Sequence, residues 1–225
     1  MLVKDWMSKS VITADINDSM QDAMRRLKEN KISMLPVIKK GKLVGVVTDR
    51  DLKRASASDA TTLEVHELLF LITKIKVQEI MTENPVTIPF DSTVEEAAEV
   101  LLEKKISGAP VVDKKGTVIG IITKNDLFRV LISLTGVGKR GIQFAFEVED
   151  RPGSIRELAD VIRRYGGRMV SILSTYENVR AGYRKVFIRM YGVERDQLPQ
   201  LEKELGEKAK YLYLVDHREN RREIF

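Results

Sequence analysis

Cysteine is absent from this chain of 225 residues, and no run of apolar residues approaches the length of a membrane span. Without thiols the chain can form no disulfides, thiolate metal ligands or cysteine nucleophiles, which suits a reducing compartment. The first ten residues (MLVKDWMSKS) also lack the hydrophobic core of a signal peptide. We therefore expect a cytoplasmic location, with neither membrane insertion nor export.

Catalytic motifs are scarce as well. Histidine occurs only at positions 66 and 217, and the sequence contains no glycine-rich phosphate loop and no cluster with metal-ligand spacing. A lone histidine such as His66 is more often a packed or surface residue than a ligand. We therefore expect no catalytic residues and no bound metal, and we keep an enzyme acting on nucleotides as an alternative.

Charge of one sign is in only slight excess, at +5. Lysine and arginine alternate with glutamate and aspartate along most segments, which is typical of a solvated surface. The basic end of the chain, HRENRREIF from His217, reads as a frayed polar tail over 217–225. We expect no nucleic-acid partner, and a basic nucleic-acid-associated regulator is the alternative.

The chain does contain an internal repeat. A segment of about 50 residues from Val3 returns from Val77, with a spacing of 74 residues that one insertion changes to 75. Met7 aligns with Met81, and Asp51 aligns with Asp126. Two copies are too few for a solenoid, so the repeat predicts two related units that pack face to face and form two equivalent ligand clefts.

Each copy predicts the order strand, helix, strand, strand, helix, over 1–57 and 76–135. Apolar residues recur with helical spacing after capping residues in both copies, Asp18-Ser19 in the first and Asp91-Ser92-Thr93 in the second. Short β-branched runs joined by glycine-containing turns predict a hairpin. Residues 58–75 have roughly helical apolar spacing and predict a linker helix. The apolar stripes of the first helices are Met20, Ala23, Met24 and Leu27, and Val94, Ala97, Ala98, Leu101 and Leu102.

A Thr-x-x-Asp motif begins the last helix of each copy, at Thr48–Asp51 and Thr123–Asp126. One interpretation is a capping box, in which each side chain satisfies a backbone donor. The other is a ligand site, because a helix N-terminus suits an anion and a carboxylate can accept both hydroxyls of a ribose. The intervening Arg50 and Lys124 add positive charge for phosphate. The two roles are compatible.

The whole repeat resembles the CBS domain, and the pair resembles a Bateman module across residues 1–135. Both copies carry an opening V-x-x-W/I-M segment, an Ile-Ser-x-x-Pro-Val motif and a Gly-h-h-Thr-x-x-Asp-Leu motif, where h is apolar. The resemblance implies an α+β fold of two β-α-β-β-α units with pseudo-two-fold symmetry. It also implies that an adenosine-type ligand, AMP, ADP, ATP or S-adenosylmethionine, binds in the paired clefts.

The resemblance further implies roles for particular positions. The aspartate of the motif would hold ribose hydroxyls, with the threonine beside phosphate or ribose. The segment before the first helix would meet the adenine edge, and the start of the next strand would wall its face. Because Met34 corresponds to Gly108, we expect the clefts to differ in room and affinity. The candidate residues are Thr13, Ala14, Met34, Leu35, Pro36, Thr48, Arg50, Asp51, Thr87, Ile88, Gly108, Ala109, Pro110, Thr123, Lys124 and Asp126.

A glycine-rich segment, 136–141, marks a domain boundary, and the pattern beyond it changes. An alternating run, a DRPG turn and a helix ended by Gly166–Gly167 come first. A hairpin about NVRAG, a helix near Pro199 and the strand YLYLVD follow. The order β-α-β-β-α-β over 140–216 is the ferredoxin-like motif.

This second domain resembles an ACT domain, on the segment Glu149-Asp-Arg-Pro-Gly153 followed by a helix and Gly-Gly. The resemblance implies an amino-acid-type effector at Asp150, Arg151 and Gly153, where backbone N–H groups can receive a carboxylate. The Asn-Ile that is frequent at the head of the next strand is replaced here by Met169-Val170. A domain that only dimerises is therefore the alternative.

The order CBS, CBS, ACT resembles proteins of the AcuB type, named for acetoin utilisation. We expect a regulatory, ligand-sensing protein without chemistry of its own, which forms a homodimer and transmits to a protein target that the sequence does not identify. Adenine nucleotide would change the relative pose of the repeats, through a difference in affinity for the two states.

Overall fold

The computed structural model describes residues 1–59 and 73–225. Most of the predicted linker helix and His66 therefore lie outside the described residues. The chain forms two compact units, Met1–Phe128 and Arg129–Phe225. Within the described ranges, no helix has both the length and the apolar character needed to cross a membrane.

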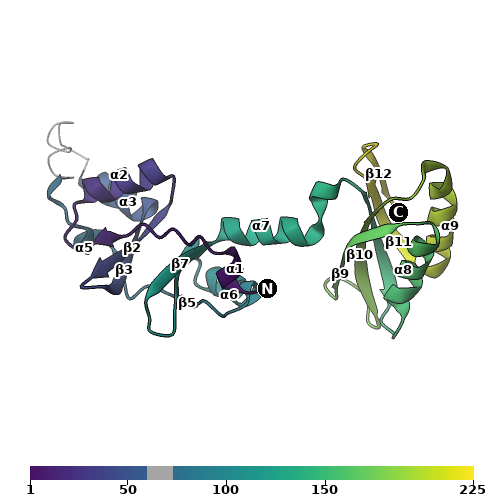
Figure 1. The fold of residues 1–225 in the computed structure, drawn as a ribbon, viewed down its shortest axis with the longest axis horizontal. Coiled ribbons are helices and arrows are strands. Elements are labelled where there is room, and N and C mark those ends of the chain that lie inside the picture. The colour runs from purple at the N-terminus through teal and green to yellow at the C-terminus, as the bar shows by residue number, and fades with distance from the viewer. Residues whose placement is uncertain (60–72) are drawn as a thin grey trace. The chain divides into compact units, whose positions relative to one another are not determined.

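The first unit contains both repeats, and each follows the predicted order β-α-β-β-α (Figure 1). Each copy opens with a short helix, and the second has one further two-residue strand before the predicted order begins. The first comprises α1 (Val3–Trp6), β1 (Ala14–Asp15), α2 (Met20–Asn30), β2 (Met34–Lys39), β3 (Lys42–Thr48) and α3 (Asp49–Asp59). The second comprises α5 (Val77–Ile80), β4 (Thr82–Glu83), β5 (Ile88–Pro89), α6 (Val94–Glu103), β6 (Gly108–Val112), β7 (Val118–Thr123) and α7 (Lys124–Thr135).

The first helix of each copy begins at the predicted cap and buries a narrower stripe than predicted. The Ser19 hydroxyl accepts from the backbone N–H of Asp22, and Thr93 forms a reciprocal capping box with Glu96. Three residues of each predicted stripe are buried, but Met24 is 40% exposed and Leu102 is 74% exposed. A helix on the surface of a small sheet covers it with only part of its circumference.

The opening segments of the two copies are exchanged, which the repeat pattern did not predict. Helix α1 packs on α6 and β7 of the second copy, and the backbone of Ser8 pairs with that of Ile121. In turn, β4 from the second copy pairs with β3, giving one sheet of order β1-β2-β3-β4 and another of order β5-β6-β7. Val77 accordingly belongs to the core of the first copy.

Glycines make this exchange possible at two equivalent positions. A Cβ at Gly45 would lie 2.6 Å from Sδ of Met81, and one at Gly120 would lie 2.3 Å from Sδ of Met7. Each glycine thus accepts the methionine that the other copy's opening segment brings. This contact explains why both the methionine and the glycine recur in the repeat.

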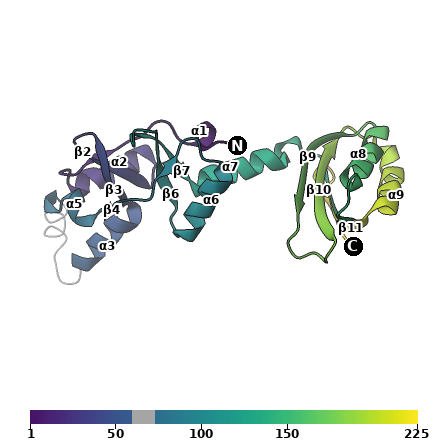
Figure 2. The same ribbon diagram turned by 90° about the horizontal axis from the view of Figure 1, so that it is seen from below.

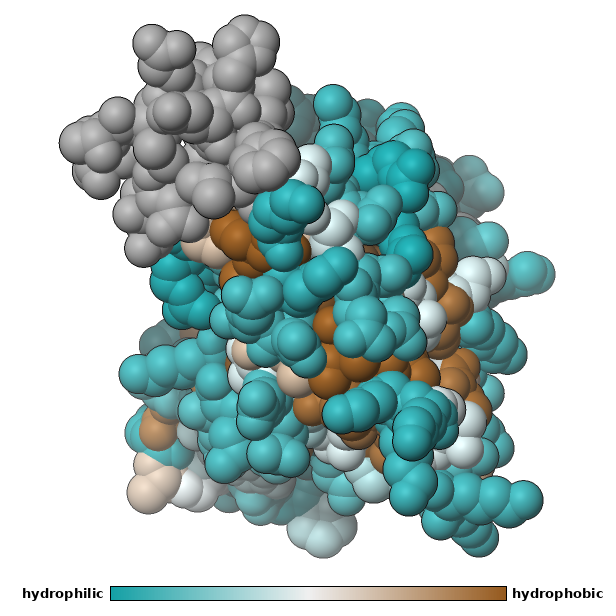
Figure 3. Space-filling view, turned by 90° about the vertical axis from the view of Figure 1, so that its left-hand side faces the viewer, coloured by the Kyte–Doolittle hydropathy of each residue, from teal (hydrophilic) through white to brown (hydrophobic). Residues whose placement is uncertain are grey.

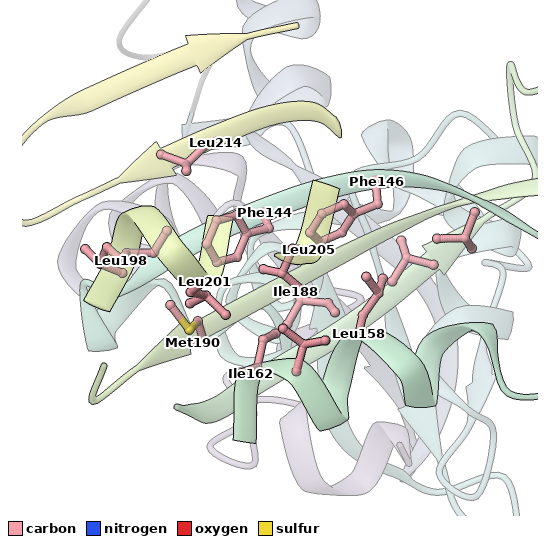
Figure 4. Packing of buried hydrophobic residues seen from close by; sticks show 14 residues of the cluster. Phe144, Phe146, Leu158, Ile162, Ile188, Met190, Leu198, Leu201, Leu205 and Leu214 are labelled. Carbon is pink, nitrogen blue, oxygen red and sulfur yellow. The ribbon is translucent and has the colours of Figure 1, made fainter. Parts of the chain in front are cut away.

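The second unit has the predicted β-α-β-β-α-β order with one further strand. Its sheet order is β12-β11-β8-β10-β9, and Figures 1 and 2 show both long helices on the same face. The core between helices and sheet includes Phe144, Leu158 and Leu201 (Figure 4). The elements are β8 (Ile142–Glu149), α8 (Ser154–Arg164), β9 (Arg168–Thr175), β10 (Tyr183–Tyr191), α9 (Leu198–Lys208), β11 (Lys210–Asp216) and β12 (Arg221–Ile224), with one-turn 3-10 helices at Val137–Lys139 and Arg195–Gln197.

The expectation of a frayed tail over 217–225 is wrong for Arg221–Ile224, which pair with β11 as an antiparallel strand. Arg221 anchors this strand, because its guanidinium donates to Glu202 of α9 at 3.0 and 3.1 Å and to Glu223 at 2.6 Å. The face of the molecule in Figure 3 is mainly hydrophilic, as the alternating charges predicted.

Candidate functional site

At the start of α3, Thr48 and Asp51 form the hydrogen bonds that the capping interpretation predicts. Oδ2 of Asp51 accepts from the Thr48 hydroxyl at 2.6 Å and from the Thr48 backbone N–H at 3.0 Å. Oδ1 of the same carboxylate accepts from Arg54 at 3.1 Å. Asp51 is buried, at 8% exposure, so these bonds hold its carboxylate in one orientation.

The start of α7 repeats this arrangement. Oδ2 of Asp126 accepts from the Thr123 hydroxyl at 2.7 Å and from the Thr123 backbone N–H at 2.8 Å. Asp126 is also buried. The motif therefore sets the same local geometry twice, and what surrounds each copy decides what it can bind.

A cavity of about 530 Å³ opens between the two repeats at the start of α3. This volume lies within the usual range for a small-molecule site. The exchange of opening segments shapes it, because Asn84, Pro85 and Val86 follow β4, which pairs with β3. The lining residues are Ser33, Met34, Val46, Thr48, Asp49, Arg50, Asp51, Arg54, Thr82, Asn84, Pro85, Val86, Lys105, Ile106, Ser107, Gly108, Pro110 and Thr123.

The cavity brings together some of the sequence-predicted candidates from both copies. These are Met34, Thr48, Arg50, Asp51, Gly108, Pro110 and Thr123. Met34 and Gly108, the pair on which the expected difference between the clefts was based, both line this one cavity. The interface between the copies, and not a single repeat, forms the site.

Other candidates do not line this cavity. The side chains of Leu35 and Ala109 are fully buried, so only the backbone of these two residues could meet a ligand. Successive residues of a strand face opposite sides, so their neighbours Met34 and Gly108 reach the cavity while these two face the core. The remaining candidates outside the lining are Thr13, Ala14, Pro36, Thr87, Ile88, Lys124 and Asp126.

Backbone contacts restrict one of these positions further. The carbonyl of Thr13 accepts from Nη1 of Arg26 at 2.9 Å, and the same nitrogen lies 2.5 Å from Asp18. Ala14 and Ile88 are buried. The segment before each first helix is thus committed to internal contacts at these residues.

Sequence reasoning missed several lining residues, chiefly Asn84, Pro85, Val86 and Lys105. The first three follow the repeated methionine Met81, but nothing in one sequence says which copy that segment packs on. Lys105 adopts a left-handed backbone conformation (φ +53°) after α6. With Arg50 and Arg54 it gives the cavity three exposed cationic side chains.

The predicted effector site of the second unit is largely engaged by its own side chains. Arg151 donates to both oxygens of Glu157 at 2.7 and 2.9 Å and to Glu149 at 3.2 Å. The Glu157 hydrogen bonds raise the pKa of Arg151 and lower that of Glu157. Gly153 precedes α8 with a φ of +90°, and Asp150 lies 3.5 Å from Nε of Arg184.

Among the described residues, no group of three or more acidic or histidine side chains is placed to hold a metal ion. The cavity between the two repeats is instead suited to binding a polar organic molecule. It combines a fixed carboxylate, cationic side chains and the apolar walls Met34, Val46 and Pro110.

Comparisons with known proteins identify the first unit. The family model of the CBS domain matches residues 3–58 and 77–133. A CBS domain-containing protein of Dictyostelium discoideum is 40% identical over 135 residues, which cover 60% of this chain and 93% of that protein.

Two solved structures extend the comparison. The CBS domain pair of protein MJ0100, in complex with 5′-methylthioadenosine and S-adenosyl-L-methionine, is 36% identical, with a TM-score of 0.50 over 58% of this chain and 99% of that one. A protein from Vibrio cholerae whose name links it to acetoin utilization (AcuB) shares the fold, at 24% identity and a TM-score of 0.51 over 62% and 96% of the two chains. With its two matched repeats, this chain belongs to the family of CBS-domain proteins.

Proposed function

We propose that this chain is a regulatory protein that binds an adenosine-containing ligand in the cavity between its repeats. The observation that carries this proposal is the position of Asp51, a buried and oriented carboxylate at the start of α3 that lines a cavity of about 530 Å³. The similar CBS pair of MJ0100 supports it, since that protein is described in complex with two adenosine compounds.

The lining residues divide between the parts of such a ligand. The Asp51 carboxylate would accept the ribose hydroxyls through the lone pairs that Thr48 and Arg54 leave open. Met34, Val46 and Pro110 offer apolar surface to the adenine. Arg50 and Lys105 would attract a phosphate or a carboxylate on the ligand. Which adenosine compound binds depends on this last group.

By the same chemistry, we propose that the Thr123–Asp126 motif holds a second ligand less tightly. A ligand that contacts both repeats can change their relative pose if it binds one pose better than the other. The surface shown to a target protein would then differ between the bound and free states. Regulation, rather than chemistry, is the proposed output.

Calorimetric titration of the full chain with AMP, ATP, S-adenosylmethionine and 5′-methylthioadenosine tests the proposal. We expect at least one compound to bind, and Asp51→Ala to weaken the tighter site by about tenfold or more, because a buried bond to a charged group is lost. Asp126→Ala is the matched control. It removes the same capping bonds but should leave the tighter site within about threefold, since Asp126 does not line the cavity.

The proposal fails if none of the four compounds binds the folded wild-type chain. It also fails if the two aspartate variants weaken binding equally, because the effect would then follow helix capping and not ligand contact. Circular dichroism and melting of both variants separate loss of binding from loss of structure.

We propose that the second unit is an ACT domain and that an amino-acid-type effector binds at its β8–α8 turn. Among the described residues, Nε of Arg184 is buried there with no hydrogen bond, 3.5 Å from the Asp150 carboxylate with which it forms an ion pair, and the Arg184 guanidinium donates to the Ser154 hydroxyl at 3.2 Å. An incoming carboxylate could engage it. Titration with the twenty amino acids tests this, and binding that survives Arg184→Met would count against it.

A homodimer is part of the proposal. Apolar side chains are exposed along α7, including Leu131 at 54% and Ile132 at 56%. Exposed apolar patches on helices favour association with a second copy. Sedimentation analysis of wild type and of Leu131→Glu/Ile132→Glu would test it, and a monomeric wild type would contradict it.

A further inference from the structure

The sheet of the second unit has one face covered by α8 and α9 and one face that these helices leave open (Figures 1 and 2). On the open face, a cavity of about 440 Å³ lies over β8, β10, β11 and β12. It is distinct from the β8–α8 turn discussed above, because none of its lining residues belongs to that turn. The lining residues are Gln143, Arg189, Tyr213, Leu214, Val215, His217, Arg222, Glu223 and Ile224.

Arg189 is the unusual member of this lining. Only 5% of the residue is exposed, although it carries a guanidinium. Its Nε donates to the carbonyl of Thr135 at 2.8 Å and its Nη2 donates to Gln143, which in turn donates to the Tyr213 hydroxyl at 2.9 Å. These bonds hold the guanidinium rigidly in place.

The third nitrogen of that guanidinium differs from the other two. In the part of the chain that the structure describes, Nη1 of Arg189 is buried without any hydrogen-bond partner. An unpaired buried charge is costly, and burial accordingly lowers the pKa of Arg189. Native structures rarely leave such a group unsatisfied, and the adjoining cavity is where a water or a small molecule could supply the missing acceptor.

The charges around the cavity favour an anion. Arg222 is exposed on the edge strand and has no ion-pair partner within the described residues. Burial, followed by the positive charges of Arg189 and Arg222, lowers the pKa of His217. The carboxylate Glu223 is already engaged, since it accepts from Arg221 at 2.6 Å.

We propose that this cavity binds a small organic carboxylate with an apolar body. Its planar carboxylate group would pair with Nη1 of Arg189 and with Arg222, an arrangement that guanidinium groups favour. Its apolar body would lie against Val215, Ile224 and the ring of Tyr213. A bare phosphate would satisfy the charges but leave the apolar walls uncovered. The proposal does not depend on the adenosine site.

Matched acid and amide probes test this inference by calorimetry on the full chain. Isovalerate and benzoate should bind, whereas isovaleramide and benzamide, which have nearly the same shape without the charge, should not. Inorganic phosphate should bind more weakly than either acid. Equal heats for acid and amide, stronger binding of phosphate, or no binding of either acid would overturn the proposal.

Two substitutions locate the site. Arg189→Met should weaken isovalerate binding by about tenfold or more, through loss of charge-assisted hydrogen bonds. Arg222→Gln, on an exposed strand, should weaken it severalfold and keeps the test valid if Arg189→Met does not fold. Arg163→Met, which removes an exposed arginine of α8, is the control. Binding that both cavity variants leave unchanged would place the acid elsewhere and overturn the assignment.

Discussion

The two repeats close the same hydrogen bonds at Thr48–Asp51 and at Thr123–Asp126, yet they differ in what surrounds those bonds. Both residues of the first motif line the cavity, whereas only Thr123 of the second does. A repeated motif therefore specifies a helix start, and the segments that the other copy contributes specify a site. The motif alone therefore does not predict which residues line the cavity around it.

The second strands differ in a related way. The first copy begins this strand with Met34 and Leu35, and the second begins it with Gly108 and Ala109. A Cβ at Gly108 would lie 2.9 Å from the carbonyl oxygen of Ile122 and 3.0 Å from Cγ2 of Thr123. At Gly108 the second copy therefore has no room for a side chain, whereas the first copy has the larger Met34 at the equivalent position.

Exchanging the core residues of these strands should have the largest effect on stability. Leu35 is fully buried, so Leu35→Ala should lower the free energy of unfolding of the first unit by about 2–5 kcal/mol. Ala109→Leu should lower it by about 1–3 kcal/mol, because the site is already filled. Urea unfolding followed by the fluorescence of Trp6, which lies in this unit, measures both.

Leu102→Ala provides the control for these substitutions. Leu102 is exposed, so its truncation should change the free energy of unfolding by less than about 0.5 kcal/mol. If Leu35→Ala behaved like Leu102→Ala, the two copies would not differ in core packing and the comparison would fail.

The exchange of opening segments should produce a smaller, asymmetric effect. Gly120→Ala places its Cβ against Met7 alone, whereas Gly45→Ala also meets the carbonyl oxygen of Thr82 at 3.0 Å. Each substitution should cost about 1–3 kcal/mol. Met7→Ala should then relieve Gly120→Ala more fully than Met81→Ala relieves Gly45→Ala, because a carbonyl cannot be trimmed.

Double-mutant cycles measure this relief, and the coupling for the Met7 and Gly120 pair should fall between about 0.5 and 3 kcal/mol. If the changes in the free energy of unfolding were additive in both pairs, the methionines would not pack against the glycines. Equal coupling in the two pairs would remove the asymmetry between the copies.

Local features of the fold could be predicted from the sequence because their causes are local. Ser19 and Thr93 begin helices as predicted, and the order of elements in both units follows from periodicity and turns. The Thr-x-x-Asp motif likewise closes the capping bonds that its spacing predicts. These features depend on residues a few positions apart in the chain.

Long-range features could not be predicted in this way. Met81 contacts Gly45, and Asn84 lines the Asp51 cavity, because the opening segment of the second copy packs against the first copy. Packing against either copy satisfies the same local pattern. The strand Arg221–Ile224 was missed for a similar reason, because its anchor Glu202 lies on a different element.

Capping substitutions should give the smallest effect and the closest match between the copies. Thr48→Ala and Thr123→Ala each remove a hydroxyl that donates to an aspartate, at 2.6 and 2.7 Å, so each should lower the free energy of unfolding by about 0.5–2 kcal/mol. Thr48→Ser and Thr123→Ser keep the hydroxyl and should recover most of that loss. Because the hydrogen bonds are equivalent, the two costs measured by urea unfolding should agree within about 0.5 kcal/mol, the usual error of additivity. A much larger cost at one motif would show that its surroundings, and not only its capping bonds, contribute to the helix start, and the two motifs would then differ in local structure as well as in what lies around them.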